Sequence, residues 1–231
     1  MIKYNKAFTL AEVLITLGII GIVASMTMPT LIGKYRNQER SARIKKFYSS
    51  LQQAILLSEN DNGPIEYWTK GEKDLVNDDG DRDLEGNTKT AEAFFNKYLK
   101  NYLKHLKSGK PDFDYEGSVD YKIWFTDGST GLLHNGSCID IVLDVNGNKL
   151  PNKRAYDQFP FLICAGNDNA DQAANRMCGN KRICAYNADI NTYNTREKVL
   201  NLCKQDSKRS NCTYLLQLDN WEFKNDYPYK Y

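Results

Sequence analysis

The feature that most constrains this chain is a long apolar segment close to its start. Residues 8–32 contain one ionisable side chain, Glu12, and Lys3 and Lys6 precede them. A bilayer core about 30 Å thick is crossed by about 20 helical residues, so this segment is long enough to span it. A cleaved secretory signal has an apolar region of only about 7–15 residues. The sequence therefore predicts a membrane-spanning helix rather than an ordinary signal peptide.

The carboxylate of Glu12 is the unusual group in this segment. A charged side chain in a bilayer is costly unless it is neutralised or paired, so such residues are functional candidates. Glu12 lies close to the start of the segment, and it could instead extend into the lipid head groups. Its chemistry alone leaves both interpretations open.

A short string surrounds this acid: Ala7-Phe8-Thr9-Leu10-Ala11-Glu12-Val13-Leu14. Together with the basic leader and the apolar run, the string resembles the processing site of type IV pilins and of the pseudopilins of type II secretion and competence systems. The resemblance implies cleavage by a prepilin peptidase between Ala7 and Phe8, followed by N-methylation of Phe8. It also implies that Glu12 acts in assembly and that the helix bends at Pro29. The family usually has Gly before the cut, where this chain has Ala7.

Assembly of this kind has a physical basis in charge pairing. After cleavage the Phe8 amine would be a cation near the Glu12 carboxylate, and each would be relieved by an opposite charge from a neighbouring subunit. The resemblance implies as partners a prepilin peptidase, other pilin or pseudopilin subunits, the inner-membrane assembly machinery and the lipid bilayer. Nucleic acid is a partner only if the filament takes up DNA.

Two features disagree about which side of the membrane holds the rest of the chain. Residues 34–46 are strongly basic, which by the positive-inside rule favours the cytoplasm. All cysteines follow the apolar segment, and an even number is typical of an exported disulfide framework. We expect export, with a cytoplasmic leader (1–7), a transmembrane and polymerisation helix (8–32) and an exported globular domain (33–231). The subunit would cross the cytoplasmic (inner) membrane once before assembly and then belong to a periplasmic or cell-surface filament.

Helical periodicity continues beyond the apolar segment. Ile44, Tyr48, Leu51 and Ile55 recur at helical spacing, which predicts a helix that packs on a core and ends near residue 58. A second amphipathic helix is predicted at about 90–107.

The stretch between the two predicted helices, residues 59–90, is acidic and rich in turn residues. Arg82 stands where a calcium-binding EF-hand loop needs Gly. We therefore expect a solvated loop rather than a calcium site.

Strand patterns fill the middle of the chain. Apolar alternation predicts strands at 121–126, 131–134 and 137–145. The Asn146-Gly147 dipeptide predicts a tight hairpin turn into 148–152. These patterns predict an α+β fold class, and the resemblance implies that the fold is pilin-like: a long N-terminal helix, first transmembrane and then amphipathic, packed on an antiparallel β-sheet.

The C-terminal region is expected to be stapled by disulfides. The candidates are Cys138, Cys164, Cys178, Cys184, Cys203 and Cys212. Six cysteines allow fifteen pairings, and short loops make Cys178 with Cys184 and Cys203 with Cys212 plausible. No C-x-x-C pair is present, which disfavours a metal site. One helix is predicted here, from an Asn194 cap to about Gln205.

The sequence offers little support for an enzyme. Its two histidines, His105 and His134, lie near no nucleophile motif, and there is no phosphate-binding glycine loop. A net charge of +2 is too small for a nucleic-acid footprint. No catalytic residue, metal or cofactor is expected. The predicted function is that of a structural or minor subunit of a type IV pilus or type II secretion-like pseudopilus. The alternative is a membrane-anchored exported binding module that does not polymerise.

Overall fold

The computed structural model describes residues 9–112, 119–166, 169–207 and 209–229. The helices are α1 (Leu10–Asn62), the 3-10 helix η1 (Ile65–Tyr67), α2 (Leu84–Tyr98), α3 (Asn169–Cys178), α4 (Arg196–Gln205) and α5 (Cys212–Leu218). The strands are β1 (Lys107–Gly109), β2 (Tyr121–Trp124), β3 (Thr130–Asn135), β4 (Ile139–Asp144), β5 (Gln158–Ile163) and β6 (Ile183–Ala185). The strands form one antiparallel sheet in chain order, β1 to β6. This is the α+β, pilin-like fold that the sequence predicts.

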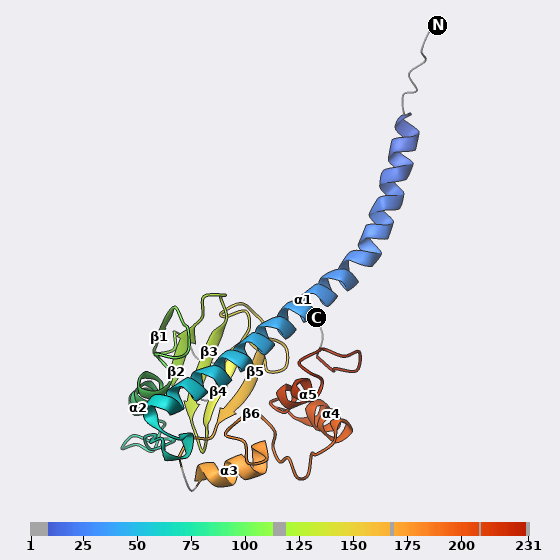
Figure 1. The fold of residues 1–231 in the computed structure, drawn as a ribbon. Helices are drawn as coiled ribbons and strands as arrows, with labels where there is room; N and C mark the ends of the chain where they lie inside the picture. Colours follow the sequence, from blue (N-terminus) through green and yellow to red (C-terminus); the bar gives the residue numbers. More distant parts are fainter. Residues whose placement is uncertain (1–8, 113–118, 167–168, 208, 230–231) are drawn as a thin grey trace.

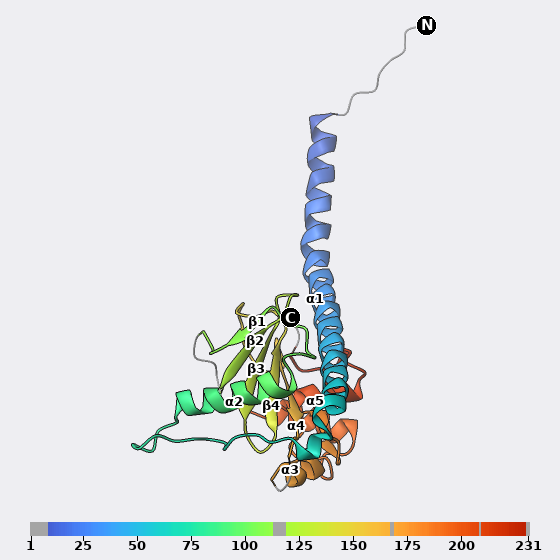
Figure 2. The same ribbon diagram turned by 60° about the vertical axis from the view of Figure 1, so that its left-hand side comes forward.

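Helix α1 has two halves in different surroundings. Its N-terminal half stands clear of the globular part, and its C-terminal half lies across the sheet (Figures 1 and 2). The buried side chains all belong to the second half: Arg40, Ile44, Phe47, Leu51, Ala54, Ile55 and Ser58. The predicted apolar stripe is therefore confirmed. The helix continues past residue 58 to Asn62, and Gly63 ends it with a φ of 76°.

The sheet presents two different faces because side chains alternate along each strand. Ile139, Ile141 and Leu143 of β4 belong to the main core, whereas Asp140 and Asp144 project from the opposite face. α1, α2 and α5 lie against the core face. α3 packs on the other face, where its alanines meet side chains of β5 and β6. In Figures 1 and 2, α3 and η1 lie at the end of the globular part away from the free half of α1.

Phe161 on β5 joins three parts of the core. Its ring centroid lies 5.3 Å from that of Phe47, 5.7 Å from that of Tyr48 and 5.8 Å from that of Trp221. Phe47 and Tyr48 belong to α1, and Trp221 follows α5. This aromatic cluster fixes α1 and the C-terminal region to the same strand.

The second helix begins and ends earlier than the sequence predicts. α2 spans Leu84–Tyr98 rather than 90–107, because the Asp83 carboxylate caps it by accepting the N–H of Gly86 (2.9 Å). At the other end, the N–H groups of Leu99 and Lys100 both donate to the carbonyl of Phe95, which closes the helix. Residues 99–106, where the sequence predicts helix, form turns instead, and the chain then adds edge strand β1.

Part of the acidic stretch 59–90 belongs to the core, which corrects the expectation of a solvated loop. Ile65 and Trp68 are buried, and Trp68 stacks on Tyr98 with ring centroids 4.4 Å apart. The Trp68 indole N–H donates to the Gly63 carbonyl (2.7 Å). Among the described residues, no group of three or more His, Cys, Asp or Glu side chains is placed to hold a metal ion.

The predicted tight hairpin at Asn146-Gly147 is wrong. β4 pairs instead with β5, and residues 145–157 form a long loop between them. The Asp157 carboxylate organises this loop by accepting the N–H groups of Asn152 (2.8 Å) and Lys153 (2.6 Å). These side-chain bonds satisfy backbone donors that a strand at 148–152 would have paired in a ladder.

The C-terminal helix α4 ends at Gln205 as the sequence predicts, but its cap differs. Thr195 Oγ1 accepts the N–H of Lys198 (3.4 Å), so Thr195 rather than Asn194 is the cap. The Asn194 side chain accepts a hydrogen bond from Lys198 Nζ (3.2 Å) instead. Asn and Thr compete for this position because either side chain can satisfy a first-turn donor.

All six cysteines are paired. The disulfides are Cys138–Cys164, Cys178–Cys184 and Cys203–Cys212. Two of them close the short loops that the sequence makes plausible. Cys203–Cys212 joins α4 to α5 inside the core, where both residues are fully buried.

Replacing both Cys203 and Cys212 with serine should lower the free energy of unfolding by about 2–3 kcal/mol, the stabilisation of a closed loop of this length. Urea unfolding of the full chain in detergent, followed by tryptophan fluorescence, measures the change. An unchanged midpoint would show that packing alone holds α4 to α5.

Candidate functional site

The first turn of α1 places Glu12 in a capping box with Thr9. Thr9 Oγ1 accepts the Glu12 N–H (3.2 Å), and the backbone N–H and hydroxyl of Thr9 both donate to Glu12 Oε2 (2.8 Å each). These bonds satisfy donors that the start of a helix would otherwise leave unpaired. Glu12 therefore has a structural role within the single chain, besides the assembly role that the resemblance implies.

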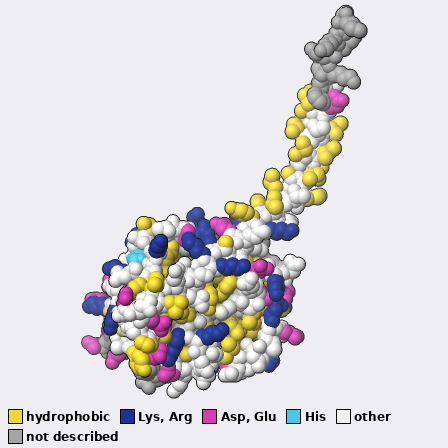
Figure 3. Space-filling view, in the orientation of Figure 1, with side chains coloured by type: hydrophobic (Ala, Val, Ile, Leu, Met, Phe, Trp, Pro, Cys, Tyr) yellow, Lys and Arg dark blue, Asp and Glu magenta, His cyan; other side chains and the backbone are white. Residues whose placement is uncertain are grey.

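The helix beyond this turn presents an uncovered apolar surface. None of its most apolar 18-residue window is buried in the chain, and by length and composition α1 is able to cross a membrane. Figure 3 shows this half as a rod covered with hydrophobic side chains. Pro29 lies inside the continuous helix, and Figure 1 shows the free half to be curved. A proline removes one helical hydrogen bond and commonly bends a helix; a bend at Pro29 itself stays a prediction.

Arg40 anchors α1 to the globular part near the free half. This residue is buried, and its guanidinium donates to the Tyr156 carbonyl and to Asn37 Oδ1. The same guanidinium lies 4.1 Å from the centre of the Phe223 ring, close enough for a cation–π interaction. Part of the basic stretch 34–46 is thus used within the domain.

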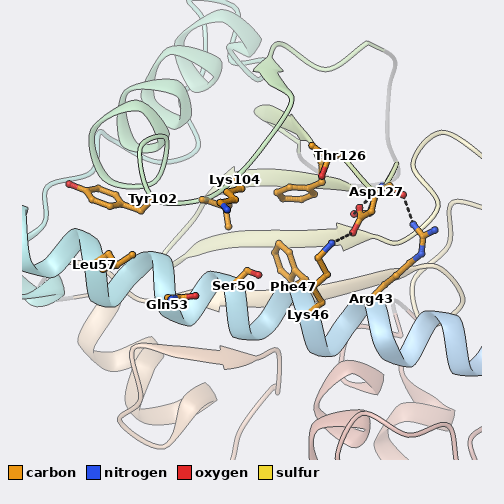
Figure 4. A pocket seen from close by; sticks show the side chains of 13 residues that line it. Arg43, Lys46, Phe47, Ser50, Gln53, Leu57, Tyr102, Lys104, Thr126 and Asp127 are labelled. Atoms are coloured by element: carbon orange, nitrogen blue, oxygen red, sulfur yellow. Dashed lines mark hydrogen bonds and ion pairs between the residues drawn. The ribbon is translucent and has the colours of Figure 1, made fainter.

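A pocket of about 430 Å³ opens beside α1 next to this anchor (Figure 4). At one end Arg43 Nη1 donates to the carbonyls of Asp127 (2.8 Å) and Val145 (2.9 Å), and Lys46 pairs with Asp127 Oδ2 (2.9 Å). Burial alone would raise the pKa of Asp127, but hydrogen bonds from Ser129 and Lys46 hold it below its ordinary value. These bonds join α1 to the turn between β2 and β3 and to the start of the loop after β4, so the groups have a structural role.

His134 lies between two carboxylates. Its Nδ1 is 2.9 Å from Asp120 Oδ2, and its Nε2 is 3.5 Å from Asp74 Oδ1. Asp120 also accepts from Arg82 and from the Asn135 N–H (2.8 Å). Burial would raise the pKa of Asp120, but His134 and these donors keep it below its ordinary value. Both ring nitrogens of His134 thus face a carboxylate of the same chain, which indicates a structural role for this histidine.

The other histidine has a packing role. His105 Nδ1 lies 2.8 Å from the Leu103 carbonyl, and its ring meets Phe95 edge-on at a centroid distance of 5.2 Å. His105 and His134 lie on separate parts of the fold, His105 between α2 and β1 and His134 on β3. The structure does not bring them into one site.

The residues predicted from the sequence for processing and assembly gather at the N-terminal end. Ala7 and Phe8 lie outside the described residues, while Glu12 and Pro29 lie on the free half of α1. Thr9, the partner of Glu12, is not among the residues predicted from the sequence. The spacing T-x-x-E just before an apolar run is the signature that could have found it.

Comparison with known families covers both parts of the chain. Residues 30–231 match a family of unknown function, DUF6613. The chain belongs to this family. Residues 2–28 match the prokaryotic N-terminal methylation motif. No curated protein and no solved structure matches the chain. The DUF6613 match begins near the middle of α1, so it takes in the helix half that lies on the sheet and the whole globular part.

The methylation motif makes this DUF6613 chain a type IV pilin-like or pseudopilin-like processed subunit. The motif implies processing by a prepilin peptidase and assembly with other pilin subunits. It is also consistent, together with the apolar helix, with anchoring in a membrane before assembly. Pilin-like families are generally structural rather than enzymatic.

Proposed function

We propose that this chain is a structural or minor subunit of a type IV pilus or of a type II secretion-like pseudopilus. Prepilin peptidase removes residues 1–7, Phe8 is methylated, and residues 8–32 hold the subunit in the cytoplasmic membrane. Residues 33–231 form the exported domain. The assembly machinery then withdraws the helix into a periplasmic or cell-surface filament.

The observation that carries this proposal is the uncovered apolar half of α1, which follows a methylation motif and begins with a carboxylate. At about 1.5 Å per residue α1 is about 80 Å long, so one half can occupy a bilayer while the other supports the domain. The same apolar surface can be covered by lipid or by the helices of other subunits. The subunit in the membrane and the subunit in the filament would thus differ in what surrounds this helix.

Charge pairing gives assembly its register in this proposal. The Glu12 carboxylate and the Phe8 amine of a neighbouring subunit each lack a charged partner in hydrocarbon, and each supplies what the other needs. Thr9 holds the carboxylate at the helix start before the neighbour arrives.

Mass spectrometry of the natural N-terminus tests the processing step. We expect a chain that begins with methylated Phe8. A natural chain that retains Met1 would contradict the proposal and favour the tethered binding module instead.

Two substitutions of Glu12 test the assembly step. Glu12→Ala removes both the charge and the capping box, whereas Glu12→Gln keeps a capping group and removes only the charge. We expect both variants to insert into the membrane and both to lose incorporation into filaments by about a hundredfold, because each leaves the partner amine unpaired.

Glu85→Gln is the matched control, since this glutamate is exposed and lies on α2. It should assemble as the natural chain does. Normal incorporation of Glu12→Gln would show that only the capping role matters. Immunoblotting of sheared filaments against membrane fractions provides the measurement.

A further inference from the structure

A buried lysine meets an amide and a carboxylate on the face of the sheet opposite α1. Lys122 lies on β2 with a fully buried side chain. Its Nζ is 2.6 Å from Asn148 Oδ1 and 2.6 Å from Asp112 Oδ1. Asn148 Nδ2 donates in turn to Asp112 Oδ2 (3.1 Å). The three side chains thus form a closed triangle of hydrogen bonds.

We propose that Lys122 and Asn148 join in an intramolecular isopeptide bond, with Asp112 as the acid–base group. Asp112 takes a proton from Nζ, and the amine attacks Cγ of Asn148 to give a tetrahedral intermediate. Asp112 passes this proton to the amide nitrogen of Asn148 and then accepts the second proton that Nζ must lose to become an amide nitrogen. The departing ammonia takes up this second proton and leaves as ammonium, so Asp112 ends as it began. One C–N bond forms, one C–N bond breaks and one ammonia molecule leaves, so the step requires no oxidant or reductant.

The geometry places the proton acceptor and the leaving nitrogen next to one another. A lysine becomes a nucleophile only after losing a proton, and Asp112 Oδ1 is within hydrogen-bond distance to receive it. The other oxygen of the same carboxylate contacts the nitrogen that must leave. Groups held in contact by a fold react far faster than free groups, and a single turnover per chain is enough.

The environment of Lys122 also favours the product. No other lysine in the described ranges is buried, and a charged amine in a protein interior is costly. The Trp124 ring, 5.0 Å from Nζ, forms one side of its surroundings. Conversion to a neutral amide removes the buried charge. The Asp112 side chain is 40% exposed, so ammonia has a route to solvent.

The bond would tie β2 to the loop 145–157, which receives the anchor of α1. Arg43 donates to Val145 and Arg40 donates to Tyr156, both in that loop. A pull on α1 would therefore reach the sheet through a covalent link. This mechanical consequence rests on the proposed function, whereas the bond itself does not.

The mass of the purified full chain tests the bond. After reduction and denaturation, we expect it to be about 17 Da lighter than the processed sequence, the mass of one ammonia. Trypsin should fail to cut after Lys122, and a peptide containing Lys122 should be linked to one containing Asn148. Lys122→Met, Asn148→Ala and Asp112→Asn should each restore the full mass, whereas the exposed control Lys89→Met should keep the deficit.

The unmodified mass in the natural chain, with normal cleavage after Lys122, would overturn the proposal even if a variant failed to fold. A deficit that maps to Asn146-Gly147, where an asparagine can cyclise and also lose ammonia, would overturn it as well. Neither result would bear on the N-terminal processing. The isopeptide proposal can therefore be refuted while the proposed function stands, and the reverse also holds.

Discussion

Replacing Phe161 with alanine is expected to lower the free energy of unfolding by about 3–5 kcal/mol. The side chain is fully buried and contacts Phe47 and Tyr48 of α1 and Trp221 beyond α5. Its removal leaves a cavity where three elements meet, and none of them can close it alone. α1 would lose part of its attachment to the sheet.

Chemical denaturation of the full chain in detergent, followed by circular dichroism, gives this free energy. Tyr67→Ala is a suitable control, because Tyr67 is a 70% exposed aromatic residue and its loss should change stability by less than about 0.5 kcal/mol. A loss below about 1 kcal/mol for Phe161→Ala would show that α1 is held mainly by other contacts.

Replacing Asp144 with asparagine should stabilise the chain at alkaline pH. Asp144 is fully buried on β4, and burial raises its pKa from 3.8 to about 7, with the charge of Asp157 adding to the rise. Hydrogen bonds from Gln158 Nε2 (3.0 Å) and the Asn146 N–H (3.2 Å) oppose the shift. The folded chain therefore holds this proton at pH values where the unfolded chain has released it.

The direction of the pH effect follows from that proton. Between about pH 4 and pH 7 the folded state binds more protons than the unfolded state, so this group's contribution to stability falls as the pH rises. Above pH 7 the loss is complete. An asparagine does not titrate, so the variant should be more stable than the natural chain by about 2–4 kcal/mol at pH 8.

Thermal or urea unfolding of both chains between pH 4 and pH 8 measures this difference. The gap should widen steadily with pH and be small at pH 4. Asp78→Asn, at an exposed position of the acidic loop, should show no such trend. A variant that is less stable than the natural chain at pH 8 would mean that Asp144 is held charged by its neighbours.

The N-terminal part of the fold follows directly from the sequence. The stripe containing Ile44, Leu51 and Ile55 predicts the docked half of α1, because helix periodicity alone determines which side chains share a face. The strands at the centre of the sheet follow from apolar alternation in the same way. Both patterns are local and strong.

The helix starts and the loop that the sequence predicts wrongly depend on competition between side-chain hydrogen bonds. Asp83 and Thr195 cap helices where other polar residues nearby were equally suitable, and Asp157 builds a loop where a dipeptide favoured a tight turn. Side-chain hydrogen bonds of this kind are weak individually. Tertiary packing decides which of them form.

The two candidate sites also differ in how far the local sequence predicts them. Glu12 is recognisable because its partners lie within a few residues, and Thr9 could have been found from spacing alone. Lys122, Asn148 and Asp112 come from a strand and two separate loops, and nothing in their local sequence links them. Only the fold shows that these three side chains meet.

The continuity of α1 fixes which way the globular part points. α1 runs as one continuous helix from its apolar half to the far end of the sheet. If the apolar half is anchored in a membrane as proposed, the same end of the globular part would always face the bilayer. In that arrangement the loop 145–157 would lie on the side of the domain that faces the bilayer. η1, α3 and the acidic stretch after α1 lie at the opposite end of the globular part (Figures 1 and 2), so that end would be the first surface to meet an approaching molecule.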